Sequence, residues 1–449
     1  MVFYSLLDVD LYLTESNLKI SPGYNKLPGH IVFKHKLVPS LISQGKIKVD
    51  FEPSDRAEII SYIKNIELTV EKSEKMTLNN KYKFSVKGQF YDYSGYAKVN
   101  RNIVRCLNSI SPVAIDPIDI KNMKLNKEDI LDISDFPLSS DACVKIDSIV
   151  PSNTYASIGK FNSKIIYTTI ETSTVNKDIC AIIDSYDEIW TTSNFCKESM
   201  ISSGIKKNIK VVPGPISINK YDDISKIDLT GQVKKFIFLS VFNWNYRKAP
   251  EVLIKSYIKE FSSEDDVTLL MVCRSDKSCN DPNLIRSKID NIIKKEDKGS
   301  LTPHIARYSQ PLSESQLRSL YRSCNVYVQP SRGEGYGLPY IEASMCGLPV
   351  VSTKWGGQLD FLNDSNSTLV EIDKMEKLSS QTGVYFWDSE SMPYLLTDSF
   401  IKRFGMAMRE NYEDYKNKLN KVNNVKENII NYLSEDKVTK YIRDLYENI

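Results

Sequence analysis

The sequence predicts an α/β protein in which two doubly wound domains face each other across a central cleft. At 449 residues, the chain is too long for one ordinary domain. Strand-like apolar runs and helix-like amphipathic runs alternate twice, and a polar segment at 222–233 separates the two series. Such alternation is typical of parallel sheets with helices on both faces, whose ligands bind beyond the carboxyl ends of the strands.

Residues 1–78 differ from the rest of the chain and predict a small strand-rich N-terminal extension. Short apolar runs alternate there with Pro and Gly, which is a pattern of short strands and turns. The polar stretch EKSEKMTLNN near its end would be a linker. We interpret this extension as an accessory module.

The first α/β domain is expected at 79–226. A strand should end at Phe90, Gly95 lies in a polar turn, and the apolar residues that follow repeat at helical spacing. The further expected elements are strands at 164–171, 187–193 and 209–216 and helices at 176–186 and 195–204.

The second α/β domain is expected at 227–390, and charged helices at 391–449 would cross back to the first domain. The expected strands are 235–242, 267–273, 325–330 and 349–353, and the expected helices are 249–261, 313–324 and 339–346.

The composition favours a soluble globular protein over a nucleic-acid-binding or membrane protein. The formal net charge is +2, and no apolar run reaches membrane-spanning length. The first residues carry aspartates and no basic segment, so no signal peptide is expected. The eight cysteines include no CxxC pair, which favours reduced thiols and a cytoplasmic location.

The most informative segment is PSRGEGYGLPYIE, directly after the strand expected at 325–330. Its glycines would let the backbone approach an anion, and Pro339 suits the first position of a helix, whose free N–H groups favour a phosphate. Glu334 and Glu342 flank this cradle and could accept hydrogen bonds from sugar hydroxyls. The alternative is a plain helix start in which Glu342 only complements the helix dipole. The residues expected to line the ligand here are Glu334, Gly335, Tyr336, Gly337, Leu338 and Glu342.

Other candidate residues follow expected strands in the same way. Arg247 and Lys248 lie at a strand-to-helix turn, where cations can stabilise a departing diphosphate; otherwise they are an ordinary exposed basic pair. Gly95 would permit a ligand to approach a helix start, or would only form a turn. Glu171 and Ser193 follow strands of the first domain and could line an acceptor pocket or have a purely structural role.

Two further features are weaker. The turn formed by Trp355, Gly356, Gly357 and Gln358 either contacts the ligand or only permits a change of direction. The three histidines, at 30, 35 and 304, are isolated, and no DxD element follows a strand of the alternating domains, so no metal site is expected.

These motifs resemble those of the retaining GT-B glycosyltransferases of family 4, from about Lys81 to the C-terminus. The E-x7-E motif of that family matches Glu334 and Glu342, and its GxGLPxxEAmacGxPVv run matches 335–351. Its basic turn matches Arg247 and Lys248. Its first-domain glycine loop matches Gly95, and its GG turn matches Gly356 and Gly357.

The resemblance implies two Rossmann-like domains and a metal-independent transfer from a UDP- or GDP-sugar to an acceptor hydroxyl, with retention of anomeric configuration. Glu342 would bind the ribose, Glu334 would contact the transferred sugar, and Lys248 with Arg247 would hold the diphosphate. The first domain would bind the acceptor and the second the donor.

The chain also departs from the family pattern. Phe242 and Asn243 occupy a region where many members carry an arginine, and no histidine lies between His35 and His304. Glu171 or a hydroxyl would therefore replace the histidine that many members place near the reaction centre. A nucleotide-sugar epimerase and a non-catalytic binding module of the same fold are the alternatives.

The acceptor stays open at the level of the sequence. A glycan, a lipid-linked precursor, a protein or a hydroxylated base in phage DNA would each fit. The N-terminal module could recruit that acceptor or mediate self-association into an oligomer.

Overall fold

The computed structural model describes five short strands within the first 50 residues and then residues 82–446, apart from 120–132, 140–141, 152–156, 158–160, 276–281, 297, 311 and 379–390. Residues 1–81 with 151–160 form one compact unit, and 82–150 with 161–449 form the other.

The N-terminal unit contains the short strands that its Pro- and Gly-rich sequence predicts. β1 (Val2–Ser5) lies between β4 (Gly23–Lys26) and β5 (Ile47–Asp50) in an antiparallel sheet. β2 (Leu11–Leu13) and β3 (Leu18–Ile20) form a separate antiparallel pair.

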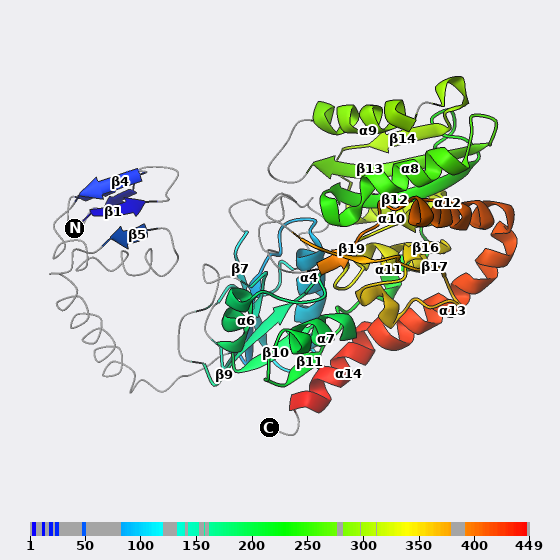
Figure 1. The fold of residues 1–449 in the computed structure, drawn as a ribbon. Helices are drawn as coiled ribbons and strands as arrows, with labels where there is room; N and C mark the ends of the chain where they lie inside the picture. The colour runs from blue at the N-terminus through cyan, green and yellow to red at the C-terminus, as the bar shows by residue number, and fades with distance from the viewer. Residues whose placement is uncertain are drawn as a thin grey trace, which may run out of the picture. The chain divides into compact units, whose positions relative to one another are not determined.

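The larger unit begins with a six-stranded parallel sheet in the order β11-β10-β9-β8-β6-β7 (Figure 1). Its strands are β6 (Phe84–Gly88), β7 (Val113–Pro117), β8 (Val144–Ser148), β9 (Ser163–Thr168), β10 (Glu188–Thr191) and β11 (Ile209–Val211). Its helices are α4 (Gly95–Asn108), α6 (Lys177–Asp184) and α7 (Asn194–Ser202). Each helix has a side-chain N-cap, from Ser94, Asn176 and Ser193 respectively.

Two details of this sheet differ from the sequence prediction. The strand expected at 209–216 ends at Val211, because Pro213 and Pro215 have no N–H to donate to a ladder. Strands β7 and β8 were not predicted. β8 is fully buried, yet its sequence VKIDS contains a lysine and an aspartate that obscure the apolar pattern.

The second sheet is also six-stranded and parallel, in the order β14-β13-β12-β15-β16-β17. Its strands are β12 (Phe236–Trp244), β13 (Val267–Ser275), β14 (His304–Tyr308), β15 (Val326–Gln329), β16 (Val350–Thr353) and β17 (Thr368–Val370). The helices are α8 (Pro250–Glu260), α9 (Pro282–Glu296), α10 (Glu314–Ser323) and α11 (Leu338–Met345). Helix α9 and strands β14 and β17 were not predicted.

Three helices complete the chain: α12 (Asp398–Glu413), α13 (Tyr415–Leu433) and α14 (Glu435–Tyr446). Helix α12 packs on α8 of the second sheet, α13 on α11, and α14 on α4 of the first (Figure 1). A short antiparallel pair, β18 (Met375–Lys377) and β19 (Ser391–Pro393), lies beside them in sequence. The C-terminal helices thus contact both halves of the larger unit.

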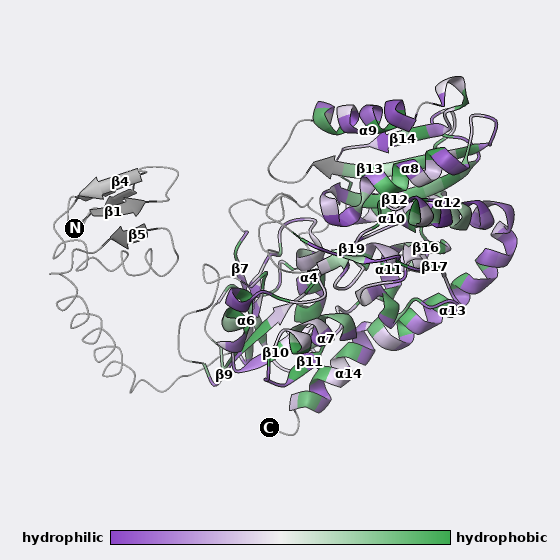
Figure 2. Ribbon diagram, viewed as in Figure 1, coloured by the Kyte–Doolittle hydropathy of each residue, from purple (hydrophilic) through white to green (hydrophobic). Residues whose placement is uncertain are grey.

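Apolar side chains fill both faces of the two sheets. One cluster joins α4, the first sheet, α11 and the terminal helices, and the other joins β12, α8 and α12. Figure 2 shows hydrophobic residues along the strands and both hydrophobic and hydrophilic residues along the helices that cover them. Two doubly wound parallel sheets confirm the predicted fold class. Among the helices of the described residues, none has the length and apolar character to cross a membrane.

Candidate functional site

The carboxyl ends of strands from both sheets meet, and polar side chains gather where they do. On the first side, segments after β6, β9 and β10 carry Lys98, Glu171 and Ser193. On the second side, segments after β12 and β15 carry the basic turn and the loop of Glu334. Contacts between these segments, described below, cross from one sheet to the other.

The basic turn after β12 is a 3-10 helix, η3 (Tyr246–Lys248). The side chain of Asn245 caps it by accepting a hydrogen bond from the Lys248 N–H at 3.0 Å. Ala249 follows with a φ of 48°, a left-handed conformation that costs energy for a residue with a Cβ. Pro250 then starts α8. These constraints fix where Arg247 and Lys248 lie.

Both cations of this turn contact Glu334. Lys248 Nζ lies 2.5 Å from Glu334 Oε1, and Arg247 Nη1 lies 3.2 Å from Oε2. Arg247 Nε also pairs with Glu171 of the first sheet, at 2.9 Å. The structure therefore brings four predicted site residues, 171, 247, 248 and 334, into one cluster whose formal charges balance.

Burial changes how these groups titrate. Burial alone would raise the pKa of Glu334, but Lys248 and Arg247 lower it below its usual range. For Glu171, burial dominates and raises the pKa, in spite of Arg247. Burial also lowers the pKa of Lys248, against the pull of Glu334. Glu171 is thus the carboxylate of this cluster that accepts a proton most readily.

Glu342 lies on α11 and meets a cation of the first domain. Lys98 Nζ, on α4, lies 2.5 Å from Glu342 Oε1, and the Tyr321 hydroxyl donates to Oε2 at 3.3 Å. Helix α11 begins at Leu338, one residue before the predicted position, after Gly337 with a φ of 87°. Only glycine adopts such a backbone readily.

A second cross-domain ion pair adjoins the first. Arg101, one helical turn after Lys98, is 2% exposed, and its Nη2 lies 2.6 Å from Glu314 at the start of α10. Arg101 also donates to the carbonyls of Phe90 and Asp92, in the loop before α4. Helix α4 is therefore tied to both α10 and α11.

The structure shows that position 335 requires glycine for a reason other than the approach of an anion. A Cβ at this position would lie 2.1 Å from Thr169 Cγ2 and 2.5 Å from the Ile170 carbonyl. The Gly335 carbonyl also accepts a hydrogen bond from the Ser193 hydroxyl at 2.5 Å. Gly335 therefore permits close contact between the two domains, and its approach to a phosphate stays a prediction.

The remaining predicted residues differ in how deeply they are buried. Tyr336 is buried, and its hydroxyl donates to the Gly214 carbonyl, whereas Leu338 packs at the edge of the core. Gly95 is exposed, and a Cβ there would meet nothing within 4 Å.

The GG turn packs against the loop of Glu334. The Gly357 N–H donates a hydrogen bond to the Glu334 carbonyl at 2.6 Å. The side chain of Gln358 is buried, and its amide nitrogen donates hydrogen bonds to the Thr353 and Trp355 carbonyls. The Trp355 ring meets Phe195 of the first domain edge-on. This turn therefore supports the loop of Glu334. Whether it also contacts the ligand stays a prediction.

No metal cluster accompanies these groups. Among the described residues, no three His, Cys, Asp or Glu side chains are placed to hold a metal ion. The His304 ring is hydrogen-bonded to Thr268 at 2.9 Å, and His30 and His35 lie outside the described residues.

Comparisons with known proteins assign the second α/β domain to a family. A family profile described as "Glycosyl transferases group 1" matches residues 233–382, which carry the basic turn and both glutamates. This match places residues 233–382 in the group 1 glycosyltransferase family.

Solved structures share the overall architecture of this chain. HepE of Anabaena, solved in complex with UDP and glucose, has a TM-score of 0.59 at 12% identity, over 82% of this chain and 100% of that chain. The sucrose-phosphate synthase of Thermosynechococcus elongatus has a TM-score of 0.58 at 14% identity, over 82% and 99%. At these identities the likeness concerns the fold, which is GT-B.

Curated relatives match shorter parts of the chain. D-inositol 3-phosphate glycosyltransferase 2 of Catenulispora acidiphila is 39% identical over 67 residues, which are 15% of this chain and 16% of that protein. An uncharacterized 41.2 kDa protein in the cps region of Klebsiella pneumoniae is 21% identical over 236 residues, 51% of this chain and 58% of that protein. The matched part of the chain thus spans well under two thirds of these relatives' own length.

Sequence reasoning missed several charged residues of the candidate site. Lys98 and Arg101 come directly after the turn of Gly95, and the helix start there could have pointed to them. Arg332, two residues before Glu334, is fully buried and donates to the Tyr246 carbonyl at 2.6 Å and to Glu251 at 2.5 Å. Arg332 thereby ties the loop of Glu334 to the basic turn, which no sequence pattern indicated.

Proposed function

We propose that this protein transfers a sugar from a nucleotide sugar to an acceptor hydroxyl, with retention of anomeric configuration. The observation that carries this proposal is the cluster of Glu334 with Lys248 and Arg247, at 2.5 and 3.2 Å, beside the second glutamate of the E-x7-E motif. Two cations and two carboxylates at the facing ends of two doubly wound sheets suit a ligand with a diphosphate at one end and hydroxyls at the other.

The donor would lie across the second domain. Glu342 would accept hydrogen bonds from two ribose hydroxyls, because an ionised carboxylate has only acceptors to offer. The diphosphate would lie against Lys248, Arg247 and the N-terminal turn of α11. A uridine nucleotide is the first candidate, since HepE, which shares the fold, was solved with UDP and glucose; a GDP-sugar is the second.

Catalysis would depend on stabilisation of the departing diphosphate. As the bond to the sugar breaks, negative charge grows on the leaving group, and Lys248 and Arg247 would stabilise it in a buried site. Glu334 would lie on the side of the transferred sugar, where its carboxylate stabilises an oxocarbenium-like transition state. Glu171, whose pKa burial raises, would take the proton of the acceptor hydroxyl.

The acceptor would bind on the side of Glu171 and Ser193, in the first domain. We propose a glycan hydroxyl as the acceptor, since the Glu171 carboxylate can accept hydrogen bonds from neighbouring sugar hydroxyls. A hydroxylated base in DNA is another of the candidates that the sequence leaves open, and an acceptor panel with glycans and such DNA separates the two classes.

The test is an NMR assay of the full chain with UDP- and GDP-hexoses, with and without oligosaccharides and hydroxymethylated DNA. We expect release of the nucleoside diphosphate, faster with the correct acceptor, and a product with the anomeric configuration of the donor. Conversion of the donor into an epimer without transfer would favour the epimerase. No consumption of any nucleotide sugar would contradict the proposal.

A further inference from the structure

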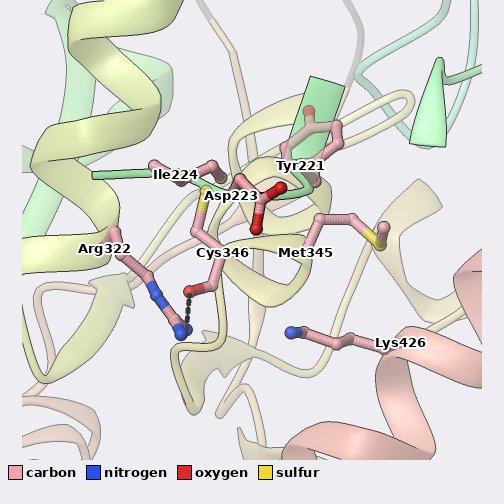
Figure 3. Close-up of a pocket in the computed structure, with 7 residues that line it drawn as sticks. All are labelled: Tyr221, Asp223, Ile224, Arg322, Met345, Cys346 and Lys426. Atoms are coloured by element: carbon pink, nitrogen blue, oxygen red, sulfur yellow. Dashed lines mark hydrogen bonds between the residues drawn. The ribbon is translucent and has the colours of Figure 1, made fainter. Parts of the chain in front are cut away.

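A separate polar cavity lies on the far end of α11 from its N-terminus. It encloses about 300 Å³, at the lower end of small-molecule sites, and is lined by seven residues (Figure 3). They come from the ends of α10 and α11, from α13, and from the end of the 3-10 helix η2 (Ile218–Tyr221) with the segment that follows it: Tyr221, Asp223, Ile224, Arg322, Met345, Cys346 and Lys426.

Two cations converge in this cavity. A Cβ on Gly347 would lie 2.8 Å from Arg322 Nη1 and 3.8 Å from Lys426 Nζ, so both nitrogens lie within 4 Å of one point. Figure 3 shows both side chains directed toward the same space. Burial and the neighbouring Arg322 lower the pKa of Lys426, so the two positive charges are close enough to oppose each other.

Of these two cations, only Arg322 has a role in capping a helix. Arg322 Nη1 donates to the Cys346 carbonyl at 3.1 Å and so stabilises the C-terminal end of α11. Lys426 has no hydrogen bond or ion pair with another described residue. Within the part of the chain that the structure describes, neither Arg322 nor the half-buried Lys426 forms an ion pair with a carboxylate, so a ligand can supply the missing negative charge.

The rest of the lining defines the ligand further. The cavity is larger than a bare phosphate needs, and the exposed carboxylate of Asp223 lines it together with the two cations. A carboxylate repels an anion but accepts hydrogen bonds from hydroxyls. The combination fits a molecule with a dianionic group at one end and hydroxyls at the other.

We propose that this cavity binds a phosphorylated sugar, with the phosphate on Arg322 and Lys426 and the hydroxyls on Asp223. The site stands apart from the cluster of Glu334 and Lys248 and does not depend on the proposed transfer reaction. Its lining joins the segment between the two α/β domains to α11, the helix of Glu342. Occupancy would therefore fasten that segment to the second domain.

The test is calorimetric titration of the full chain with a hexose 6-phosphate, with inorganic phosphate and with the unphosphorylated hexose. We expect the hexose phosphate to bind, inorganic phosphate to bind about tenfold more weakly, and the hexose not to bind. Lys426→Met should weaken hexose phosphate binding about tenfold, and Lys426→Arg should restore it. Lys416→Met, at an exposed position of the same helix, is the matched control and should bind as the wild type does.

The variant Lys248→Ala distinguishes this cavity from the donor site and should keep full affinity for the hexose phosphate. Three results would overturn the proposal: wild-type affinity in Lys426→Met, loss of binding in Lys248→Ala, or equal affinities for hexose phosphate and inorganic phosphate.

Discussion

The ammonium group of Lys98 lies 2.5 Å from Oε1 of Glu342, although 244 residues separate the two in sequence. Lys98 belongs to the first α/β domain and Glu342 to the second, so the pair joins the domains at the site itself. The carboxylate that we assign to the ribose is already neutralised by this lysine. A nucleotide that binds there must displace Lys98 or share Glu342 with it.

A double-mutant cycle on this pair should reveal strong coupling. Lys98→Met and Glu342→Gln should each lower the free energy of unfolding, by about 3 kcal/mol, because each leaves a largely buried partner unpaired. The double variant should lose less stability than the sum of the two single variants. Urea unfolding measures this difference, the coupling energy, which should be about 1–3 kcal/mol.

The matched control is the exposed pair Lys354 and Glu371, whose nitrogen and oxygen lie 2.8 Å apart. Lys354→Met and Glu371→Gln should couple by less than about 1 kcal/mol, since water screens surface pairs. Additive effects at Lys98 and Glu342 would show that this contact does not join the domains.

Glu334→Gln should abolish transfer while it preserves the fold. The amide keeps the shape of the side chain but has no charge to stabilise the oxocarbenium-like transition state, so we expect the turnover rate to fall at least about a hundredfold. Nucleotide release by chromatography measures the rate, and thermal unfolding checks the fold. Glu413→Gln, at an exposed position of α12, is the control and should keep wild-type turnover; a Glu334→Gln enzyme as fast as this control would remove Glu334 from the site.

Gly335→Ala should loosen the contact between the two domains. The added Cβ would overlap Thr169 Cγ2 and the Ile170 carbonyl, at 2.1 and 2.5 Å, and the carbonyl cannot yield without a backbone shift. We expect a clearly lower melting temperature in scanning calorimetry. Gly95→Ala is the contrast, because its Cβ meets nothing within 4 Å: stability should be unchanged, and only donor affinity should fall. Equal stability of both variants would contradict this account of Gly335.

The pair of Arg101 and Glu314 should make stability depend on pH. Burial alone would raise the pKa of Glu314, but Lys98 and Arg101 lower it from 4.5 to about 2. A carboxylate with a lowered native pKa stabilises the fold above its unfolded pKa, and this contribution is lost as the pH falls toward the native value.

The comparison of wild type with Glu314→Gln isolates this contribution. The difference in their free energies of unfolding should shrink by about 2 kcal/mol between pH 5 and pH 3. Urea unfolding across that range measures it. A difference that stays constant with pH would mean that Glu314 is not held ionised by its neighbours.

Sequence patterns predicted those parts of the fold whose side chains are uniformly apolar. β12 and β15 read as continuous buried runs, and the loop of Glu334 is defined by its glycines and by Pro339. β8 escaped detection because Lys145 and Asp147 interrupt it. Both are buried: Lys145 pairs with Asp116 at 2.7 Å, and Asp147 accepts from the Tyr186 hydroxyl. Those partners lie on other elements and cannot be seen in one strand.

The sequence indicated which residues form the candidate site but not which of them pair with one another. Their positions beside a glycine-rich helix start and at a strand-to-helix turn indicated Glu334, Glu342, Arg247 and Lys248. These positions could not indicate that Lys98 lies against Glu342, because that contact depends on how two separately folded sheets face each other. The raised pKa of Glu171 likewise depends on its burial in the folded chain, which the sequence does not reveal.

The most direct test of the central claim, a nucleotide-sugar site built on the basic turn, is calorimetric titration of the full chain with uridine diphosphate. Wild type and Lys235→Ala, whose lysine is almost fully exposed on the same domain, should bind equally. Lys248→Ala should bind at least about tenfold more weakly, because a charge-assisted contact to the diphosphate is lost. Equal affinity in Lys248→Ala and wild type, or no binding of any nucleoside diphosphate to wild type, would contradict the account.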